Sequence, residues 1–331
     1  MPLIRIRRGW EIPEREATPE AVYLNRRNFI KTLGLGSIGA FGLLSACRNG
    51  SADGTQAAAG QPSATRSVPK SATSNLYPAR RNPNFKLDRP ITPEQVAGRY
   101  NNFYEFSDQK DVWRYVDQFH TRPWQVEVKG LVEKPQVFDI DNLVRKMPLE
   151  ERLYRHRCVE AWAMAVPWTG FPMKALLDHV QPKSSATHVR MLTFLRPSEA
   201  PGQREQDWYP WPYFEGLTMA EAMNELTFLV TGIYGHELTI PHGAPIRLAT
   251  PWKYGYKSIK SIVLIEVTNK QPPTFWNKIA PDEYDFWSNV NPYKPHPRWS
   301  QARERMIDTG EYRDTLLYNG YAPYVAHLYQ T

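Results

Sequence analysis

The residue with the clearest chemical potential is Cys158, in the run Arg155-His156-Arg157-Cys158-Val159-Glu160-Ala161-Trp162. The chain has two cysteines, and the other, Cys47, ends what reads as an export signal. A single thiol left in an exported protein cannot form an internal disulfide. The basic neighbours predict a lowered thiol pKa and therefore a thiolate, which is both the nucleophilic and the metal-binding form. We expect a soft, electron-poor group to bind at Cys158.

The N-terminus carries the pattern of an export signal. Arg26 and Arg27, followed by Phe29 and Lys31, precede an apolar but glycine-interrupted run over 33–46. That run is too short to span a bilayer as a helix. A twin-arginine pair marks the route that carries folded proteins across the bacterial inner membrane. The sequence therefore predicts a twin-arginine signal peptide over 1–47 and a periplasmic location.

Cys47 leaves two interpretations open. Leu44-Ser45-Ala46-Cys47 resembles the lipobox of bacterial lipoproteins, in which the cysteine is acylated and becomes the mature N-terminus. Each buried CH₂ of an acyl chain contributes about 0.8 kcal/mol to anchoring, so two or three chains would hold the protein firmly. In the alternative, Cys47 lies near an ordinary cleavage site within a discarded peptide.

Composition changes after the signal. Residues 48–76 are mostly small and polar, and such a segment cannot bury enough surface to offset its conformational entropy. We expect 48–76 to be a disordered linker and 77–331 to be one folded catalytic domain. Of the formal charge of +7, residues 1–47 carry +3. The remaining +4 gives no reason to expect nucleic acid as a partner.

The folded region reads as a β-rich mixed domain of the α+β class. The 29 prolines of the chain argue for short strands joined by many loops. Alternation and breaker residues predict strands over 124–128, 136–140, 152–157, 188–195, 245–249 and 259–267. Helices are expected after a cap at Asp141, from Pro172 onward and over 217–226, with a long packed connector over 271–299. Cys158 then lies at the end of a strand, where functional residues are common.

Several motifs resemble the catalytic subunits of the periplasmic protein-methionine-sulfoxide reductases, which are molybdopterin enzymes of the sulfite oxidase superfamily. The resemblance covers nearly all of 77–331. Its landmarks are Tyr100-Asn101-Asn102-Phe103-Tyr104-Glu105-Phe106, Cys158-Val159-Glu160-Ala161-Trp162, Pro167-Trp168-Thr169-Gly170-Phe171-Pro172, Gly243-Ala244-Pro245-Ile246-Arg247-Leu248, the run from Pro251 to Lys260, and Asn289-Val290-Asn291-Pro292. It implies a sulfite-oxidase-like molybdopterin-binding fold and a Mo-molybdopterin cofactor in its mononucleotide-free form.

The resemblance also implies the site. Cys158 would be the molybdenum ligand and catalytic residue, which agrees with the affinity of that metal for soft thiolates. The implied cofactor contacts are Asn101, Tyr104, Glu105, Cys158, Thr193, His242, Arg247, Ser258, Ile259 and Lys260. His242 departs from the family pattern, which often has Asn there, although imidazole can still donate a hydrogen bond.

The cofactor phosphate is expected at 258–260 and Arg247, because cations and backbone N–H groups bind phosphate. Lys253, Lys257 and Lys260 could instead form a solvated face, but the aromatic residues between them argue against a purely solvated strip. Trp252 and Tyr254 are candidates for the floor of the substrate cleft.

The implied reaction is reduction of methionine sulfoxide, free or within oxidised periplasmic proteins, by oxygen-atom transfer between Mo(IV) and Mo(VI). The sequence has no Cys-x-x-Cys-His haem motif and no iron–sulfur cysteine set. Electrons would come from a partner, by resemblance a haem-containing integral membrane subunit that draws on the quinone pool.

Two alternatives stay open at this point. One is a sulfite oxidase-like or general S-/N-oxide molybdoenzyme, for which Arg155, Arg157 and Arg196 would bind an anionic substrate. The other is a non-catalytic lipoprotein that acts as a binding module.

Overall fold

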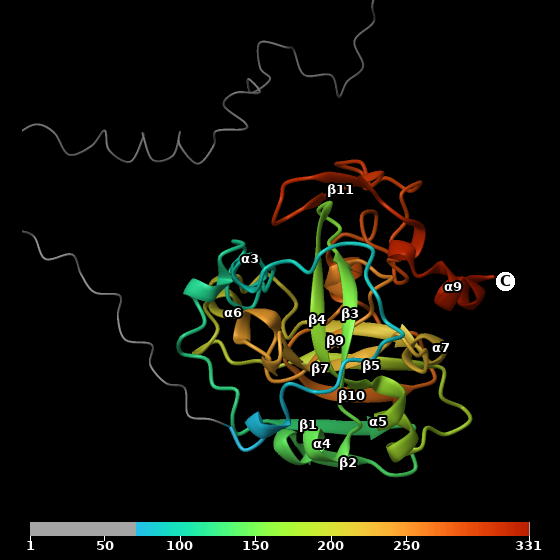
Figure 1. The fold of residues 1–331 in the computed structure, drawn as a ribbon. Helices are drawn as coiled ribbons and strands as arrows, with labels where there is room; N and C mark the ends of the chain where they lie inside the picture. Colours follow the sequence, from blue (N-terminus) through green and yellow to red (C-terminus); the bar gives the residue numbers. More distant parts are fainter. Residues whose placement is uncertain (1–70, 331) are drawn as a thin grey trace, which may run out of the picture. The chain divides into compact units, whose positions relative to one another are not determined.

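The computed structural model describes residues 71–330, which Figure 1 draws in colour. The predicted signal peptide over 1–47, Cys47 included, and the expected linker as far as residue 70 lie outside the described residues. The end of that linker belongs to the folded unit. Ser74–Leu76 forms the short helix η2, and the buried Thr73 donates a hydrogen bond to Glu237 at 2.8 Å. No helix within 71–330 combines the length and the apolar character needed to cross a membrane.

The first sheet has five strands in the order β2-β1-β10-β5-β6. They are β1 (Gln125–Gly130), β2 (Gln136–Asp139), β5 (His188–Thr193), β6 (Phe214–Thr218) and β10 (Ile262–Thr268). β1 and β10 run parallel and the other neighbours antiparallel. Val126 and Val128 of β1 are fully buried, as the alternation predicted. Together with α4 (Ile140–Lys146) and α5 (Met173–Val180), which lie beside this sheet in Figure 1, they form the larger hydrophobic core.

The second sheet carries the functional hairpin. Its seven strands follow the order β12-β11-β4-β7-β8, with β3 paired to β4 and β9 paired to β7. They are β3 (Glu150–Arg157), β4 (Trp162–Pro172), β7 (Phe228–Ile233), β8 (His236–Glu237), β9 (Arg247–Ala249), β11 (Arg303–Met306) and β12 (Tyr312–Asp314). β3 and β4 pair antiparallel over their whole length, from Glu150 opposite Gly170 to Arg157 opposite Ala163. This pairing fixes the turn that holds Cys158.

Short helices fill the connections between the strands. They are α3 (Glu94–Arg99), η3 (Val112–Arg114), α6 (Pro201–Glu205), α7 (Met219–Ala222), η4 (Ile240–His242), η5 (Gly255–Lys257), α8 (Phe275–Ile279), η6 (Leu317–Gly320), α9 (Ala322–Val325) and η7 (Ala326–Tyr329). The β-rich α+β fold predicted from the sequence is confirmed.

Two helix predictions need correction. The cap of α4 is Asp139 and not Asp141, because the Asp139 side chain accepts the hydrogen bond of the Asn142 N–H at 3.1 Å. The helix expected over 217–226 is the single turn α7, since residues up to Thr218 pair with β5 as strand β6.

Candidate active site

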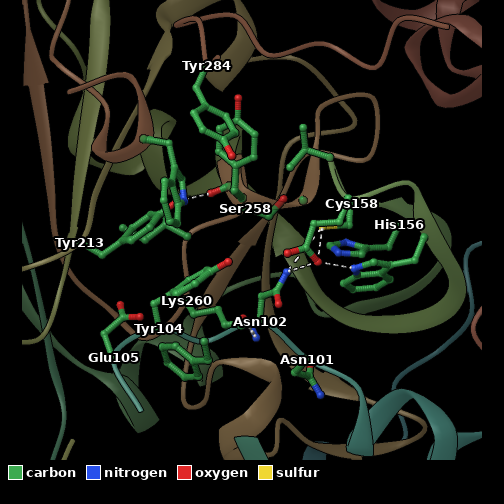
Figure 2. Close-up of a pocket in the computed structure, with 18 of the residues that line it drawn as sticks. Asn101, Asn102, Tyr104, Glu105, His156, Cys158, Tyr213, Ser258, Lys260 and Tyr284 are labelled. Atoms are coloured by element: carbon green, nitrogen blue, oxygen red, sulfur yellow. Dashed lines mark hydrogen bonds between the residues drawn. The ribbon is translucent and has the colours of Figure 1, made fainter. Parts of the chain in front are cut away.

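A cavity of about 530 Å³ opens beside the end of β3. Residues from distant parts of the chain line it, and Figure 2 shows several of them around a common space. The lining comprises 101–105, His156, 158–160, Trp162, Met164, Tyr209, Tyr213, Arg247, 255–256, 258–260, Trp276, Tyr284 and 298–299. Both sheets and three connections therefore contribute to one site.

Cys158 occupies the first position of the turn between β3 and β4. Its backbone N–H donates to the Trp162 carbonyl at 2.9 Å, and the Ala161 N–H donates to the Cys158 carbonyl at 3.0 Å. Ala161 adopts a left-handed conformation with φ of 63°, which lets the chain reverse within four residues. The turn holds the nearly buried sulfur at the cavity wall.

A polar cluster surrounds the Cys158 sulfur. Glu160 receives three hydrogen bonds at its Oε2 atom, from Lys110 Nζ at 2.5 Å, Trp162 Nε1 at 2.9 Å and Asn102 Nδ2 at 3.2 Å. The same amide of Asn102 lies 3.5 Å from Cys158 Sγ, and the thiol donates to Glu160 at 3.8 Å. Sequence reasoning included Asn102 and Glu160 in motifs but gave neither of them a role, and it missed Lys110.

The expected lowering of the Cys158 thiol pKa is wrong for the protein without a bound group. Burial raises the pKa of Cys158 to about 12, and the Glu160 carboxylate adds to the rise. The arginines that flank the cysteine in sequence do not face the sulfur. Arg155 binds Asp88 and the Asn319 carbonyl, while Arg157 is fully buried against Gln301 and Glu304. Strand alternation turns both arginines away from the sulfur.

Two cations face the cavity without a carboxylate in ion-pair contact among the described residues. The buried Arg247 donates to the carbonyls of His242, Ser258 and Leu248, each at 3.0 Å. Lys260 donates to the carbonyls of Asn102 at 2.9 Å and Pro241 at 2.7 Å. Burial lowers the pKa of Arg247 to about 9, and burial and then Arg247 lower that of Lys260. Since guanidinium has five donors and ammonium three, both residues keep donors for an anion.

The lysine strip is divided. Lys253 and Lys257 are fully buried and pair with Glu221 and Glu215 respectively, so neither reaches the cavity. Only Lys260 lines it. The interpretation of three lysines as a solvated face is therefore wrong for this strip, and phosphate-facing geometry holds for one lysine alone.

The loop after α3 supplies the first group of predicted residues. Asn101 caps that helix through donation to the carbonyls of Ala97 at 3.0 Å and Gly98 at 3.2 Å. Tyr104 packs edge-on against Trp276, with ring centroids 5.0 Å apart. Glu105 is nearly fully buried, and burial raises its carboxyl pKa to about 7. All three residues line the cavity.

Ser258 and Ile259 also line the cavity, whereas Thr193 and His242 do not. Thr193 lies behind the wall and donates to the Ser261 carbonyl at 3.2 Å. His242 is buried edge-on to Trp168, with ring centroids 5.9 Å apart, and its Nδ1 has no hydrogen-bond partner within the described part of the chain. Both residues support neighbours that line the cavity, since His242 holds Arg247 through its carbonyl.

Other predicted contacts fall elsewhere. Trp252 is buried and donates to the Tyr329 hydroxyl at 2.7 Å, and Tyr254 lines a separate small hollow, so neither forms the cavity floor. His156, which had no assigned role, does line the cavity and faces Gly255 closely. Alternation along β3 places His156 on the same side as Cys158, and that signal was readable from the sequence.

The residues present fit a molybdopterin. A thiol is a suitable ligand for a soft metal. Two inward cations without a carboxylate partner fit a terminal phosphate, because isolated buried charge is unfavourable. Arg155, Arg157 and Arg196 do not line the cavity, and only Arg247 and Arg298 bring guanidinium groups to it. The arginines invoked for an anionic substrate are therefore not placed to bind one.

Comparison with known proteins gives three matches. Residues 114–276 match the family described as oxidoreductase molybdopterin binding domain. The chain is 44% identical to the protein-methionine-sulfoxide reductase catalytic subunit MsrP of Burkholderia mallei, over 97% of this chain and 94% of that protein. It is also similar to the sulfane dehydrogenase SoxCD from Paracoccus pantotrophus at 16% identity and a TM-score of 0.42, over 56% of this chain and 45% of that chain. Because nearly all of the chain is covered, the first of these relatives matches every segment that lines the cavity.

Proposed function

The chain belongs to the family of protein-methionine-sulfoxide reductase catalytic subunits, and from that premise we propose that it reduces methionine sulfoxide, free or within oxidised proteins, to methionine. The observation that carries the proposal is the shared cavity. It holds Cys158 together with Arg247 and Lys260, two cations that lack a carboxylate partner among the described residues. A metal ligand and an anion site thus face one space.

The cofactor is held by residues of this chain. Cys158 would bind molybdenum through Sγ, and Arg247, Ser258 and Lys260 would hold the phosphate of a mononucleotide-free molybdopterin. The molybdenum cofactor, when bound, supplies the two-electron centre that accepts an oxygen atom from a sulfoxide. The overall change consumes two electrons and two protons and yields a thioether and water. Mass spectrometry of the released cofactor tests the mononucleotide-free form.

The polar cluster beside Cys158 has the groups that the reaction needs. The Asn102 amide is a neutral donor that can orient a sulfoxide oxygen. Glu160 stays ionised, since the Lys110 ammonium lowers its carboxyl pKa against the effect of burial. Lys110 is partly open to solvent, with 30% of its side chain exposed. It can therefore take up protons from water and pass them to the cavity through Glu160.

Substitution of Cys158 by Ser and by Ala tests the proposal. We expect both variants to lose sulfoxide reduction, and the spectrum of the metal centre to change even where pterin is retained. Cys47→Ala is the matched control, because it removes the chain's other cysteine. Full activity in Cys158→Ala would remove the ligand role, and wild-type protein that binds molybdenum but reduces no sulfoxide would contradict the activity.

The partner and the compartment belong to the same proposal. The relative's name describes a catalytic subunit, which implies a second subunit. We propose that this partner is a haem-containing integral membrane protein that delivers electrons from the quinone pool to a periplasmic enzyme exported by the twin-arginine route. Replacement of Arg26 and Arg27 by lysine should leave unprocessed protein in the cytoplasm. Mass spectrometry of the mature N-terminus distinguishes acylated Cys47 from a discarded peptide.

A further inference from the structure

The mouth of the cavity is bordered by six aromatic rings in unbroken contact. In order they are Trp208, Tyr209, Trp276, Tyr284, His296 and Trp299, which we call the aromatic arc. Successive ring centroids are 5.9, 6.0, 5.5, 5.5 and 3.9 Å apart. Tyr209, Trp276, Tyr284 and Trp299 line the cavity itself. Figure 2 shows Tyr284 at its edge.

The two ends of the arc are held in place by hydrogen bonds. The Trp211 N–H donates to the Tyr209 carbonyl, and the Trp211 indole to the Gln206 carbonyl, both at 2.8 Å. At the other end, the Trp299 indole donates to the Val159 carbonyl at 2.7 Å, which ties the arc to the Cys158 turn. Rigid aromatic side chains contribute contact area at a small entropic cost on binding.

Trp208 extends the arc beyond the cavity. It is 70% exposed, although it touches Tyr209, which lines the cavity. The sulfoxide chemistry does not need a tryptophan there. A polypeptide that inserts one side chain into the cavity must lay its neighbouring residues across the mouth, since successive residues lie within about 3.6 Å of each other along the chain. Trp208 stands where such a neighbour would fall.

The charges at the mouth do not favour a charged segment. Arg298 lies over the Trp299 ring at 4.9 Å, but its guanidinium is already paired with Glu283 at 2.6 Å. Exposed aromatic faces beside a neutralised pair fit apolar side chains and peptide groups. This chemistry differs from that of the cavity interior, where unpaired cations and polar donors predominate.

We propose that Trp208 and the outer arc form a subsite for an extended polypeptide, which binds an apolar residue next to the oxidised methionine. The subsite makes an oxidised segment of a protein, with an apolar neighbour, a better substrate than the free amino acid. This inference rests on the proposed function, because it concerns the same cavity and the same reaction.

The test uses the complete molybdenum-loaded enzyme, reduced by a viologen dye. Its substrates are free methionine sulfoxide and two peptides in which leucine or glycine flanks one methionine sulfoxide. We expect the wild type to prefer the leucine peptide by about three- to tenfold in kcat/KM, the range that one aromatic contact commonly contributes. Trp208→Ala should abolish this preference, whereas Trp208→Phe should keep most of it.

Tyr312→Ala is the matched control. Tyr312 on β12 is 57% exposed and does not line the cavity, so its removal should leave the peptide preference unchanged. An unchanged preference in Trp208→Ala, or equal use of the two peptides by the wild type, would overturn the subsite while sulfoxide reduction stands. Failure of the wild type to reduce free methionine sulfoxide as well as both peptides would instead overturn the proposed function, and the subsite with it.

Discussion

The Glu160 carboxylate lies 3.8 Å from the Cys158 sulfur and accepts the hydrogen bond of its thiol. A fixed anion beside a thiol disfavours the thiolate, and this contributes to the raised pKa of Cys158. A bound cationic metal centre changes that balance, because it attracts both groups. The pair therefore stays protonated on the sulfur until a metal displaces the proton.

Glu160→Gln removes the charge but keeps the shape of the side chain. We expect kcat for sulfoxide reduction to fall by about tenfold or more, since proton delivery by a positioned group commonly contributes 10²–10⁴-fold. Bound molybdenum should stay near the wild-type level, because Glu160 is not a ligand. Steady-state kinetics and metal analysis on one preparation measure both. Glu283→Gln, at the cavity mouth, is the control, and a kcat equal to wild type in Glu160→Gln would exclude the proton role.

Glu105 makes the stability of the cofactor-free protein depend on pH. Burial raises its carboxyl pKa from 4.5 to about 7 in the folded state. The folded protein then retains a proton that the unfolded chain releases, so this contribution is complete below about pH 4.5 and is lost as pH rises through 7. Between pH 5 and 8 the wild type should lose about 1–3 kcal/mol more than Glu105→Gln does. Urea unfolding at both pH values measures the difference, and parallel curves would contradict it.

The position of the reactive cysteine was predictable from local pattern. Alternation and the breaker residues around β3 placed Cys158 at a strand end, and the motif around it indicated a metal. Strand β4 was not predicted, because ten of its eleven residues are buried and it therefore shows no alternation. Pro167 and Gly170 within it also read as breakers.

Charge placement was the least predictable feature. The sequence shows three lysines over 253–260 but not the glutamates that pair with two of them, since Glu215 and Glu221 come from a different connection. The same holds for Arg157, whose partner Glu304 lies far along the chain. Ion pairs between distant segments decide which cations remain for a ligand, and only the fold brings those segments together.

Lys253 should be needed for stability. Its ammonium is buried with Glu221 and also donates to the Trp287 carbonyl at 2.8 Å and to Asn289 Oδ1 at 2.9 Å. Lys253→Met leaves Glu221 as a buried charge without its cation, which costs about 3–5 kcal/mol. Lys174→Met is the control, because Lys174 and Asp178 form an exposed pair worth about 0.5 kcal/mol or less. Urea denaturation compares the two, and equal losses would show that the buried pair has no special weight.

Lys260 should govern retention of the cofactor more than stability of the fold. Its two present hydrogen bonds go to carbonyls, and no carboxylate within 71–330 forms an ion pair with it. Lys260→Met keeps a side chain of similar length against Gly243 and Phe103 but removes the charge that would meet the phosphate. Loss of one charged hydrogen bond costs about 2–3 kcal/mol, so cofactor affinity should fall by about 30- to 150-fold.

The measurement for Lys260→Met is molybdenum and pterin per protein after gel filtration, together with the urea midpoint of the cofactor-free protein. We expect the cofactor content to fall while the midpoint changes little, because removing this cation relieves its repulsion by Arg247. Lys278→Met, an exposed lysine outside the cavity lining, should alter neither quantity. Wild-type cofactor content in Lys260→Met would mean that the phosphate is held elsewhere, and the assignment of the inward cations to it would be withdrawn.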